Sequence, residues 1–340
     1  MKKYILSLII CILILIMCIN IGSVYVALPD ALSIAAHKLF GTALPDRIEP
    51  MTVSIFWSIR IPRALVSFFV GGALAVSGAV MQSLLQNPLA SSYTMGVSSG
   101  SAVGAALIII SGIQSFALRS FLLPATAFIF ALLTVFFVLF FSSRIDRNIH
   151  SYTIILIGMV ISLFVSASLT LLAALFHDHS QQIYFWMMGS FSARNWSHVF
   201  ILVPVCLIVT FIIMLFSREL DIMTFGDDQA MSMGVNTRNR KILLIMLTSL
   251  LTGVSVAFTG TIGFIDLVAP HAVRRIFGSR HRAVIPMSFM YGGSFMSVMD
   301  LIARTVLSPR EIPVGAVTAL IGAPFFIILF FKKRSTSPEN

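Results

Sequence analysis

Long apolar runs recur along the chain, separated by short polar segments. Nine of them are long enough to cross a bilayer as helices, which takes roughly 20 residues, and a tenth is shorter. The nine lie near residues 5–28, 62–85, 93–112, 121–141, 152–176, 198–217, 241–259, 284–307 and 313–331, and the short one near 262–277. The pattern predicts an all-α integral membrane protein of about ten transmembrane helices, with both termini on one side. Because no linker or fixed-period repeat interrupts the runs, we expect a single transmembrane domain over residues 1–340.

The composition supports a membrane protein. Hydrophobic residues make up 58% of the 340 residues and charged residues only 11%, whereas soluble domains carry about 25% charged residues. The first residues, MKKYILSLIICILILIM, also have the basic start and apolar run of a signal peptide. This run continues to about Leu28, beyond the length of a signal peptide's apolar region, so a first transmembrane helix is the preferred interpretation.

The net charge of +10 is explained by the placement of the basic residues rather than by a nucleic-acid partner. Cytoplasmic loops of membrane proteins hold excess Lys and Arg. If the N-terminus is cytoplasmic, 15 of the 23 Lys and Arg residues fall in cytoplasmic segments. The count predicts an N-in, C-in topology.

The longest polar insertion, SRELDIMTFGDDQAMSMGVNTRNRK, runs from Ser217 to Lys241 on the predicted cytoplasmic side. It is too polar to cross the membrane. Asp227 and Asp228 suit a helix N-terminus and Gly234 suits a C-terminal stop, so we expect two short helices around a glycine turn. This shape could dock a soluble partner, and an ordinary solvated loop is the alternative.

The segment HDHSQQIYFWMMGSFSARNWSHV, residues 177–199, is too short to cross the membrane twice but rich in aromatic residues. It is typical of a re-entrant or interfacial segment. His177, Asp178 and His179 do not share a helix face, so no metal site is predicted.

The three cysteines, Cys11, Cys18 and Cys206, all lie inside apolar runs. We interpret them as small core residues rather than as disulfide partners or metal ligands.

The chain has no phosphate-binding loop, no dinucleotide fingerprint and no H-E-x-x-H zinc motif. We therefore expect no cofactor and no catalytic residue on this chain. Few ionisable residues lie in the middle of the runs, where an ion-coupled transporter would place them; Asp266 and Asp300 are the main exceptions. Asp300 and Arg304 are four residues apart and are expected to pair on one helix face.

Small residues recur at four-residue spacing in two of the runs. Such steps let membrane helices approach closely. The residues predicted to pack in this way are Gly71, Ala75 and Ala79 in one run and Gly96, Gly100 and Gly104 in the next.

Several long motifs together resemble the FecCD permease family of ABC importers, which take up iron-siderophores, haem and cobalamin. The motifs are RIPRALVSFFVGGALAVSGAVMQSLLQNPLA, YTMGVSSGSAVGAAL, GTIGFIDLVAPHAVRRIFGSRHRAVIP and DLIARTVLSPREIPVGAVTALIGAPFF. The resemblance spans nearly the whole chain. It implies ten helices per subunit, a second permease subunit that is identical or related, two ATPase subunits that carry ATP and Mg²⁺, and an extracytoplasmic substrate-binding protein.

The resemblance also implies roles for particular residues. Arg60 and Arg63 of the R-x-P-R motif, with Arg304, are expected to meet acidic residues of the binding protein, for which guanidinium groups are well suited. Anchoring to lipid headgroups is the alternative. The turn Asn87, Pro88, Leu89 and Ala90 is expected to end the second span and to help close the cytoplasmic gate, or to be a turn without a gating role.

In the segment 218–240, the family's coupling pattern corresponds to Gly226, Asp227, Ala230, Met233 and Gly234. Phe225 and Met233 stand where the family has leucines, which is a mild departure. Asp266 stands where the family has glycine, and a structural use of this carboxylate is preferred over one in the pathway. His271 is interpreted as a structural histidine.

The resemblance therefore implies a multi-pass permease of the bacterial cytoplasmic membrane, working by alternating access on an iron chelate, haem or corrinoid. Its pathway is expected to be wide and largely apolar, with specificity in the binding protein. The alternative is an ion-coupled secondary transporter that acts without an ATPase and uses Asp266 or Asp300 for coupling.

Overall fold

The computed structural model describes residues 2–22, 26–113 and 115–331, and in this part of the chain all regular structure is helical. The long helices are α1 (Lys2–Asn20), α4 (Ile61–Leu84), α5 (Val97–Ile110), α6 (Phe116–Ile145), α7 (Ser151–Leu175), α9 (Trp196–Leu215), α12 (Thr237–Thr259), α13 (Ile265–Phe277), α14 (His281–Thr305) and α15 (Val314–Phe331). The short ones are α2 (Leu28–Phe40), α3 (Pro50–Ser54), α8 (His177–Met187), α10 (Ser217–Met223) and α11 (Asp227–Ser232). A π-helical turn, Ile55–Arg60, joins α3 to α4, and a 3₁₀ turn, Ser92–Met95, precedes α5.

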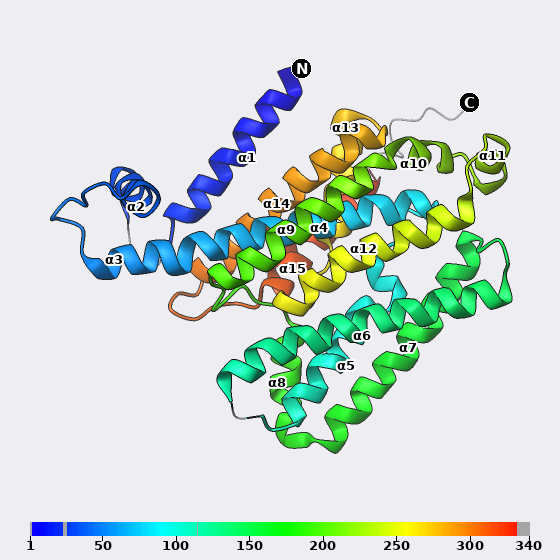
Figure 1. Ribbon diagram of the computed structural model, residues 1–340, viewed down its shortest axis with the longest axis horizontal. Helices are drawn as coiled ribbons and strands as arrows, with labels where there is room; N and C mark the ends of the chain where they lie inside the picture. Colours follow the sequence, from blue (N-terminus) through cyan, green and yellow to red (C-terminus); the bar gives the residue numbers. More distant parts are fainter. Residues whose placement is uncertain (1, 23–25, 114, 332–340) are drawn as a thin grey trace.

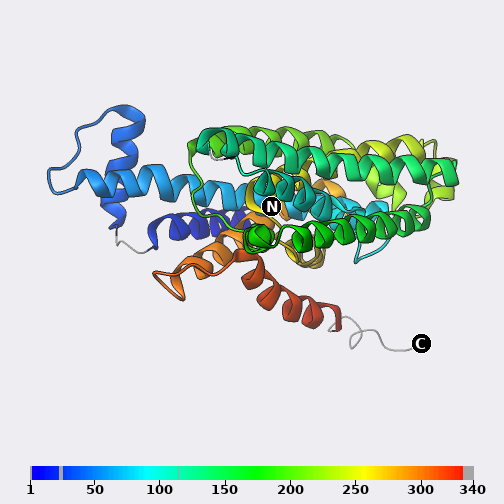
Figure 2. The same ribbon diagram turned by 90° about the horizontal axis from the view of Figure 1, so that it is seen from below.

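The long helices run roughly along one direction, so that the molecule has two ends (Figure 1). One end carries α2 and α3 and is called the α2 end here. The other carries α10 and α11 and is called the α11 end. In Figure 2, α15 leans away from the other helices, and it packs against α13 and α14.

The helices match the predicted spans within a few residues, except at the N-terminus. The predicted span 5–28 is too long, because α1 ends at Asn20 and part of the remaining stretch lies outside the described residues. The separate helix α2 was not predicted. Pro29 and Asp30 lie in its first turn, where both residues favour a helix start. Gly41, with a left-handed φ of 69°, follows its last residue, Phe40, and terminates the helix.

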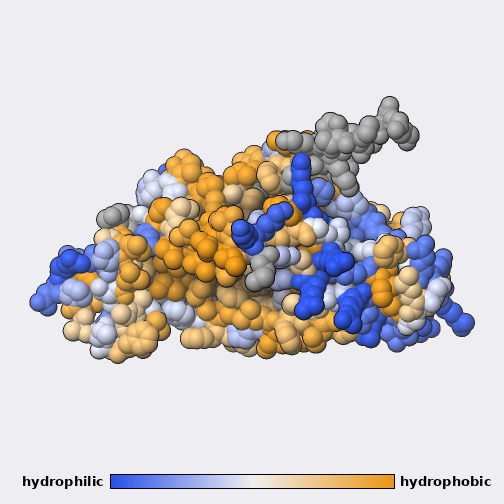
Figure 3. Space-filling model, turned by 90° about the horizontal axis from the view of Figure 1, so that it is seen from above, coloured by the Kyte–Doolittle hydropathy of each residue, from blue (hydrophilic) through white to orange (hydrophobic). Residues whose placement is uncertain are grey.

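Six helical segments of the described chain are long and apolar enough to cross a membrane: Lys2–Asn20, Pro50–Leu84, Leu118–Ile145, Ser151–Leu175, Trp196–Leu215 and Thr237–Thr259. Val97–Ile110 and Val314–Ile328 are shorter apolar helices. The hydrophobic surface covers the middle of the face in Figure 3, and hydrophilic residues gather toward its two ends. These features confirm an all-helical membrane protein, and the count of ten spans stays a prediction.

Four of the predicted small residues, Gly71, Ala75, Gly100 and Gly104, lie where helices cross. Gly71 of α4 faces the backbone of Gly292 in α14, and Gly292 in turn faces Ala75. In α5, a methyl group at Gly100 would lie 2.6 Å from the Phe130 carbonyl oxygen, and one at Gly104 would lie 2.5 Å from that of Thr126. Both distances are shorter than a carbon–oxygen contact allows, so α5 and α6, like α4 and α14, depend on glycine for their close packing.

Candidate functional site

A cluster of charged residues lies at the α2 end, where α4 begins and α14 ends. The guanidinium group of Arg63 donates to both carboxylate oxygens of Asp300, at 2.8 to 3.1 Å. Its Nη1 also donates to Glu311 Oε1 at 2.6 Å. Arg63 is therefore held by two carboxylates, and the Asp300 side chain is only 1% exposed.

Two further arginines of this cluster bind the C-terminal end of α1. Arg60 Nη1 donates to the carbonyl oxygen of Asn20 at 2.9 Å, and Arg304 Nη2 donates to that of Cys18. Carbonyl groups at a helix C-terminus lack intrahelical partners and carry partial negative charge. Arg60 and Arg304 thus hold α1 against α4 and α14.

Arg194, in the segment between α8 and α9, belongs to the same cluster although the sequence did not indicate it. Its burial lowers its pKa to about 10, and the nearby positive charge of Arg63 adds to this shift. Its Nη1 lies 3.2 Å from His198 Nε2. With Arg60 and Arg304, the cluster has four guanidinium groups and two carboxylates, so it keeps an excess of positive charge.

The three predicted docking arginines come together, but not as exposed ion pairs. Arg60 is 4% and Arg63 6% exposed, and the Arg304 side chain is 8% exposed. Their hydrogen-bond partners in this structure lie within the chain itself, and docking of the binding protein stays a prediction. The expected pair of Asp300 with Arg304 is present but long, at 3.9 Å, since Asp300 is bound chiefly by Arg63.

The turn at Asn87–Ala90 lies at the α11 end, directly after α4. Asn87 Oδ1 accepts a hydrogen bond from the Leu89 backbone N–H at 2.9 Å, and Ala90 N–H donates to the Asn87 carbonyl at 3.0 Å. Leu89 is 54% exposed. Gln86, just before the turn, donates from Nε2 to the Met223 carbonyl of α10 at 3.2 Å, which joins the turn to the polar insertion.

The polar insertion forms two short helices, α10 and α11, around Gly226, as its sequence predicts. Gly226 and Gly234 have φ angles of 116° and 84°, which favour glycine. Asp227 begins α11, and Ala230 is the buried residue of this helix. Met233, which follows the last residue of α11, is exposed.

A buried lysine fixes the start of α11. Lys241 of α12 donates from Nζ to Asp227 Oδ2 at 2.5 Å, to the Ile149 carbonyl at 3.1 Å and to Ser151 Oγ at 3.3 Å. Its side chain is fully buried. The insertion is thereby tied to the N-terminal end of α7 as well as to α12.

A chain of hydrogen bonds leads from α10 into the bundle. Asp221 of α10 accepts from the His281 backbone at 2.8 Å, and its Oδ1 lies 2.6 Å from His281 Nδ1. His281 Nε2 lies 2.7 Å from Ser83 Oγ, to which Arg274 Nη2 donates at 3.1 Å. Arg274 Nη1 also donates to Gln82 Oε1 at 2.5 Å. Helices α10, α14, α4 and α13 are therefore connected by polar side chains, of which His281 is buried and Asp221 partly exposed.

Asp266 lies in the first turn of α13 and is buried. Its Oδ2 accepts a hydrogen bond from Ser91 Oγ, and its backbone carbonyl accepts one from Gln82 Nε2 at 3.0 Å. These contacts place Asp266 in a structural network close to the Asn87–Ala90 turn. The ring of His271, one turn further along α13, packs edge-on against Phe326.

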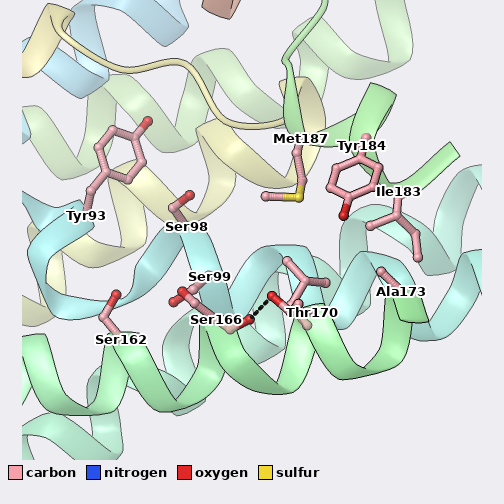
Figure 4. Close-up of a pocket in the computed structure, with 11 residues that line it drawn as sticks. Tyr93, Ser98, Ser99, Ser162, Ser166, Thr170, Ala173, Ile183, Tyr184 and Met187 are labelled. Atoms are coloured by element: carbon pink, nitrogen blue, oxygen red, sulfur yellow. Dashed lines mark hydrogen bonds between the residues drawn. The ribbon is translucent and has the colours of Figure 1, made fainter. Parts of the chain in front are cut away.

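A cavity of about 350 Å³ lies among α5, α7 and α8 (Figure 4). Hydroxyl groups line it from three directions: Ser98 and Ser99 from α5, Ser162, Ser166 and Thr170 from α7, and Tyr184 from α8. No residue that lines this cavity is charged. This cavity was not predicted from the sequence, because the three helices that form it meet only in the folded protein.

The three cysteines, and the His, Cys, Asp and Glu residues that could bind a metal ion, were also located in the structure. Cys11, Cys18 and Cys206 are free thiols and buried. Within the described residues, no three His, Cys, Asp or Glu side chains gather as they would around a metal ion.

The apolar helices, with charged and polar segments at the two ends of the bundle, define a multi-pass membrane protein. The model of the FecCD transport family matches residues 9–332, and the chain belongs to this family. It is the permease subunit of an ABC importer.

Relatives and solved structures agree with this assignment. The hemin transport system permease protein HmuU of Yersinia pestis is 35% identical, over 95% of this chain and 94% of its own length. The molybdate import system permease protein MolB of Haemophilus influenzae is 33% identical, over 87% of this chain and 86% of its own length. A solved structure described as an inward-facing conformation of a metal-chelate type ABC transporter is 30% identical with a TM-score of 0.85, covering 97% of this chain and 99% of that one.

Proposed function

We propose that this permease moves an iron chelate, haem or corrinoid from an extracytoplasmic binding protein into a bacterial cell by alternating access. In the proposed transporter, this chain crosses the membrane ten times and assembles with a second permease subunit and two ATPase subunits. The single observation that carries it is the α10–α11 insertion, which presents a surface outside the bundle and is hydrogen-bonded to the turn after α4, to the start of α7 and to the start of α14. Through His281 and Ser83 these contacts continue to α4 and α13. A movement imposed on this insertion would reach the helices around it.

The proposed orientation places the α11 end in the cytoplasm. Ten long helices that alternate in direction would bring the N-terminus and the C-terminal end of α15 to this side. The α11 end also carries several basic residues, as the positive-inside rule favours for the cytoplasmic side. They are Arg218, Arg238, Arg240, Arg274 and Arg275. Lys332, Lys333 and Arg334, which the sequence assigns to the same side, lie outside the described residues.

The arginine cluster at the opposite end would then face the binding protein. Its excess of positive charge suits an acidic partner, because complementary charge directs association. The exposed Glu311 covers one side of Arg63, so an incoming carboxylate would compete with it. Contact of these arginines with lipid phosphate is the alternative. The affinity of the purified complex for its binding protein distinguishes the two roles.

An ion-coupled secondary transporter was the alternative from the sequence, and membership of an ABC permease family replaces it. The two candidate coupling carboxylates are also engaged: Asp300 by Arg63 and Asp266 by Ser91.

ATP-driven uptake tests the proposed function. The complex purified through a tag on this chain, with its genomic partner subunits, should contain an ATPase and should accumulate a chelate in vesicles when ATP is on the α11 side. Ionophores that collapse ion gradients should leave uptake unchanged. Uptake that survives loss of the ATPase, or that stops with the ionophores, would contradict the proposal.

The substitution Glu311→Gln is expected to strengthen docking of the binding protein several-fold. It removes a competing carboxylate from Arg63, and one charge interaction at a partly exposed site contributes about 1 kcal/mol. The measurement is the affinity of the purified complex for its binding protein at low and at high salt. Glu49→Gln, an exposed carboxylate at the same end, is the matched control and should have a smaller effect. An unchanged or weaker affinity for the Glu311 variant would favour lipid contact instead.

A further inference from the structure

We propose that α2 is a membrane-surface helix, with a stripe of leucines placed among the acyl chains of the lipid leaflet at the α2 end. The partner of this surface is therefore the bilayer itself. This contact goes beyond the transport function, and it holds whichever side of the membrane the α2 end faces.

One face of α2 carries large apolar side chains that the described chain leaves exposed. At 3.6 residues per turn, Leu28, Leu32 and Leu39 lie within about 40° of one another around the helix. They are 52%, 64% and 65% exposed. These three residues are called the leucine stripe here. An exposed apolar surface of this kind indicates contact with a membrane or with another chain.

The other faces of α2 already have partners within the chain. Ala31 and Ile34 are buried in a small apolar cluster that includes Phe56. Asp30 accepts a hydrogen bond from Arg47 Nη2 at 2.6 Å. The helix thus has a buried face, a polar face and the leucine stripe. A helix that combines an apolar stripe with a polar face is typical of one that lies in the membrane interface.

The direction of α2 agrees with this position. Figure 1 shows α2 nearly end-on, and Figure 2 shows it lying across the direction of the long helices. Because the long apolar helices cross the membrane, a helix that lies across them at the end of the bundle runs along the membrane surface. Such helices place their apolar face about 5–10 Å into the boundary between headgroups and acyl chains.

The leucine stripe is continuous with the apolar surface of α1. A groove between the two helices is lined by Leu28 of α2 and by Leu13 and Met17 of α1, among others. Leu13 precedes Asn20, the last residue of α1, by about 10 Å at a helical rise of 1.5 Å per residue. The groove therefore reaches from the membrane surface into the hydrocarbon region, where a soluble binding protein cannot follow.

The surface of α1 beside the groove favours lipid over a second copy of the permease. Interfaces between membrane helices are enriched in small residues. The small residues of α1, which are Ser7, Cys11 and Cys18, are all buried against its own bundle. Ser7 Oγ, for example, lies 3.0 Å from the hydroxyl of Tyr291 in α14. The exposed side chains of α1 are mainly Ile and Leu, which suit acyl chains.

Lipid contact at α2 would also fix the level of the arginine cluster in the membrane. Phe56, which packs with α2, lies in the π-helical turn that ends at Arg60. Arg60 in turn donates to the Asn20 carbonyl at the end of α1. The end of α1, the helix α2 and the start of α4 are thus joined at one level of the bundle.

Spin-label accessibility tests the position of the leucine stripe. The full complex, with its native cysteines replaced by alanine, carries Leu32→Cys or Leu39→Cys with a spin label, in nanodiscs of phosphatidylethanolamine and phosphatidylglycerol. Collisions with oxygen, which concentrates in hydrocarbon, are compared with collisions with a water-soluble nickel chelate. Ser33→Cys is the matched control, because Ser33 lies on the polar face and donates only to the Pro29 carbonyl, at 2.9 Å.

We expect oxygen accessibility to exceed nickel accessibility at least fivefold at Leu32→Cys and Leu39→Cys, and nickel accessibility to be the greater at Ser33→Cys. Nickel accessibility above that of oxygen at the two leucine positions would place the stripe in water and overturn the proposal. Low accessibility to both reagents there would show that another protein subunit covers the stripe, which would overturn the lipid assignment.

Photo-crosslinking of the unmodified complex supplies a second measurement that needs no substitution. A phospholipid with a diazirine near the glycerol end of one acyl chain is included in the nanodiscs, and the crosslinked peptides are identified by mass spectrometry. We expect labelling of α2 within about threefold of that of α1, and at least tenfold above that of α11. Labelling of α1 without labelling of α2 would contradict the proposal.

Discussion

Replacing Arg63 with methionine is expected to destabilise the protein by about 3–5 kcal/mol, because it leaves the Asp300 carboxylate buried without its partner. Asp300 accepts three hydrogen bonds from Arg63 within 3.1 Å, and its side chain is 1% exposed. Thermal unfolding of the purified protein in detergent measures the loss. Methionine keeps most of the side-chain volume, so the change removes mainly the charge and the donors.

The ion pair between Arg47 and Asp30 provides a matched control at the same end. It has a comparable separation of 2.6 Å, but the Arg47 side chain is 67% exposed. Exposed pairs contribute about 0–1 kcal/mol, so Arg47→Met should change the unfolding temperature little. The double variant Arg63→Met, Asp300→Leu should recover much of the lost stability, since it removes the unpaired charge. Equal effects of Arg63→Met and Arg47→Met would show that burial of the Asp300 pair is not as described.

Replacing Lys241 with methionine is expected to lower the amount of substrate moved per ATP hydrolysed at least fivefold. Lys241 is the buried group that ties Asp227 of α11 to α12 and to the start of α7. Without it, Asp227 loses its charged partner, and a movement of α11 would be transmitted poorly to α7. Uptake and ATP hydrolysis measured together in vesicles give the ratio.

The neighbouring substitution Arg240→Met serves as the control for Lys241→Met. Arg240 lies 3.7 Å from Glu219 and is 37% exposed, so its loss should leave the ratio nearly unchanged. Lys241→Arg, which keeps the charge, should retain part of the coupling if the pair with Asp227 is the cause. A normal ratio in Lys241→Met would show that this tie is not required.

The elements with local signals could be predicted from the sequence. The apolar runs gave most helices to within a few residues, and the glycines and aspartates of the insertion gave α10 and α11, because caps and turns are determined by neighbouring residues. The end of α1 was missed because hydropathy continues past Asn20 while the helix does not. Pro29, Asp30 and Gly41, which delimit α2, were present in the sequence just beyond the predicted run 5–28 but were not interpreted as helix boundaries.

The partners of the charged residues could not be predicted, because they are distant in the chain. Arg63 and Asp300 are separated by 237 positions, and Asp221 and His281 by 60. The motif brought Arg60, Arg63 and Arg304 to attention, but no local pattern showed that α1 would cover two of them or that Arg194 would join them. Lys241 was counted as an ordinary cytoplasmic charge, although a lysine so deeply buried requires partners.

The glycine contacts described for α4 with α14 and for α5 with α6 have a mechanical consequence. Backbones in direct contact have no flexible side chains between them to yield, so each pair behaves as one stiff body. The chain passes from the first pair to the second through residues 85–96, where Gln86 has a φ of 51° and Gly96 one of 79°. Any rotation of one body against the other must bend this connector. The Asn87–Ala90 turn, which lies within this connector, would then be the hinge between the two helix pairs.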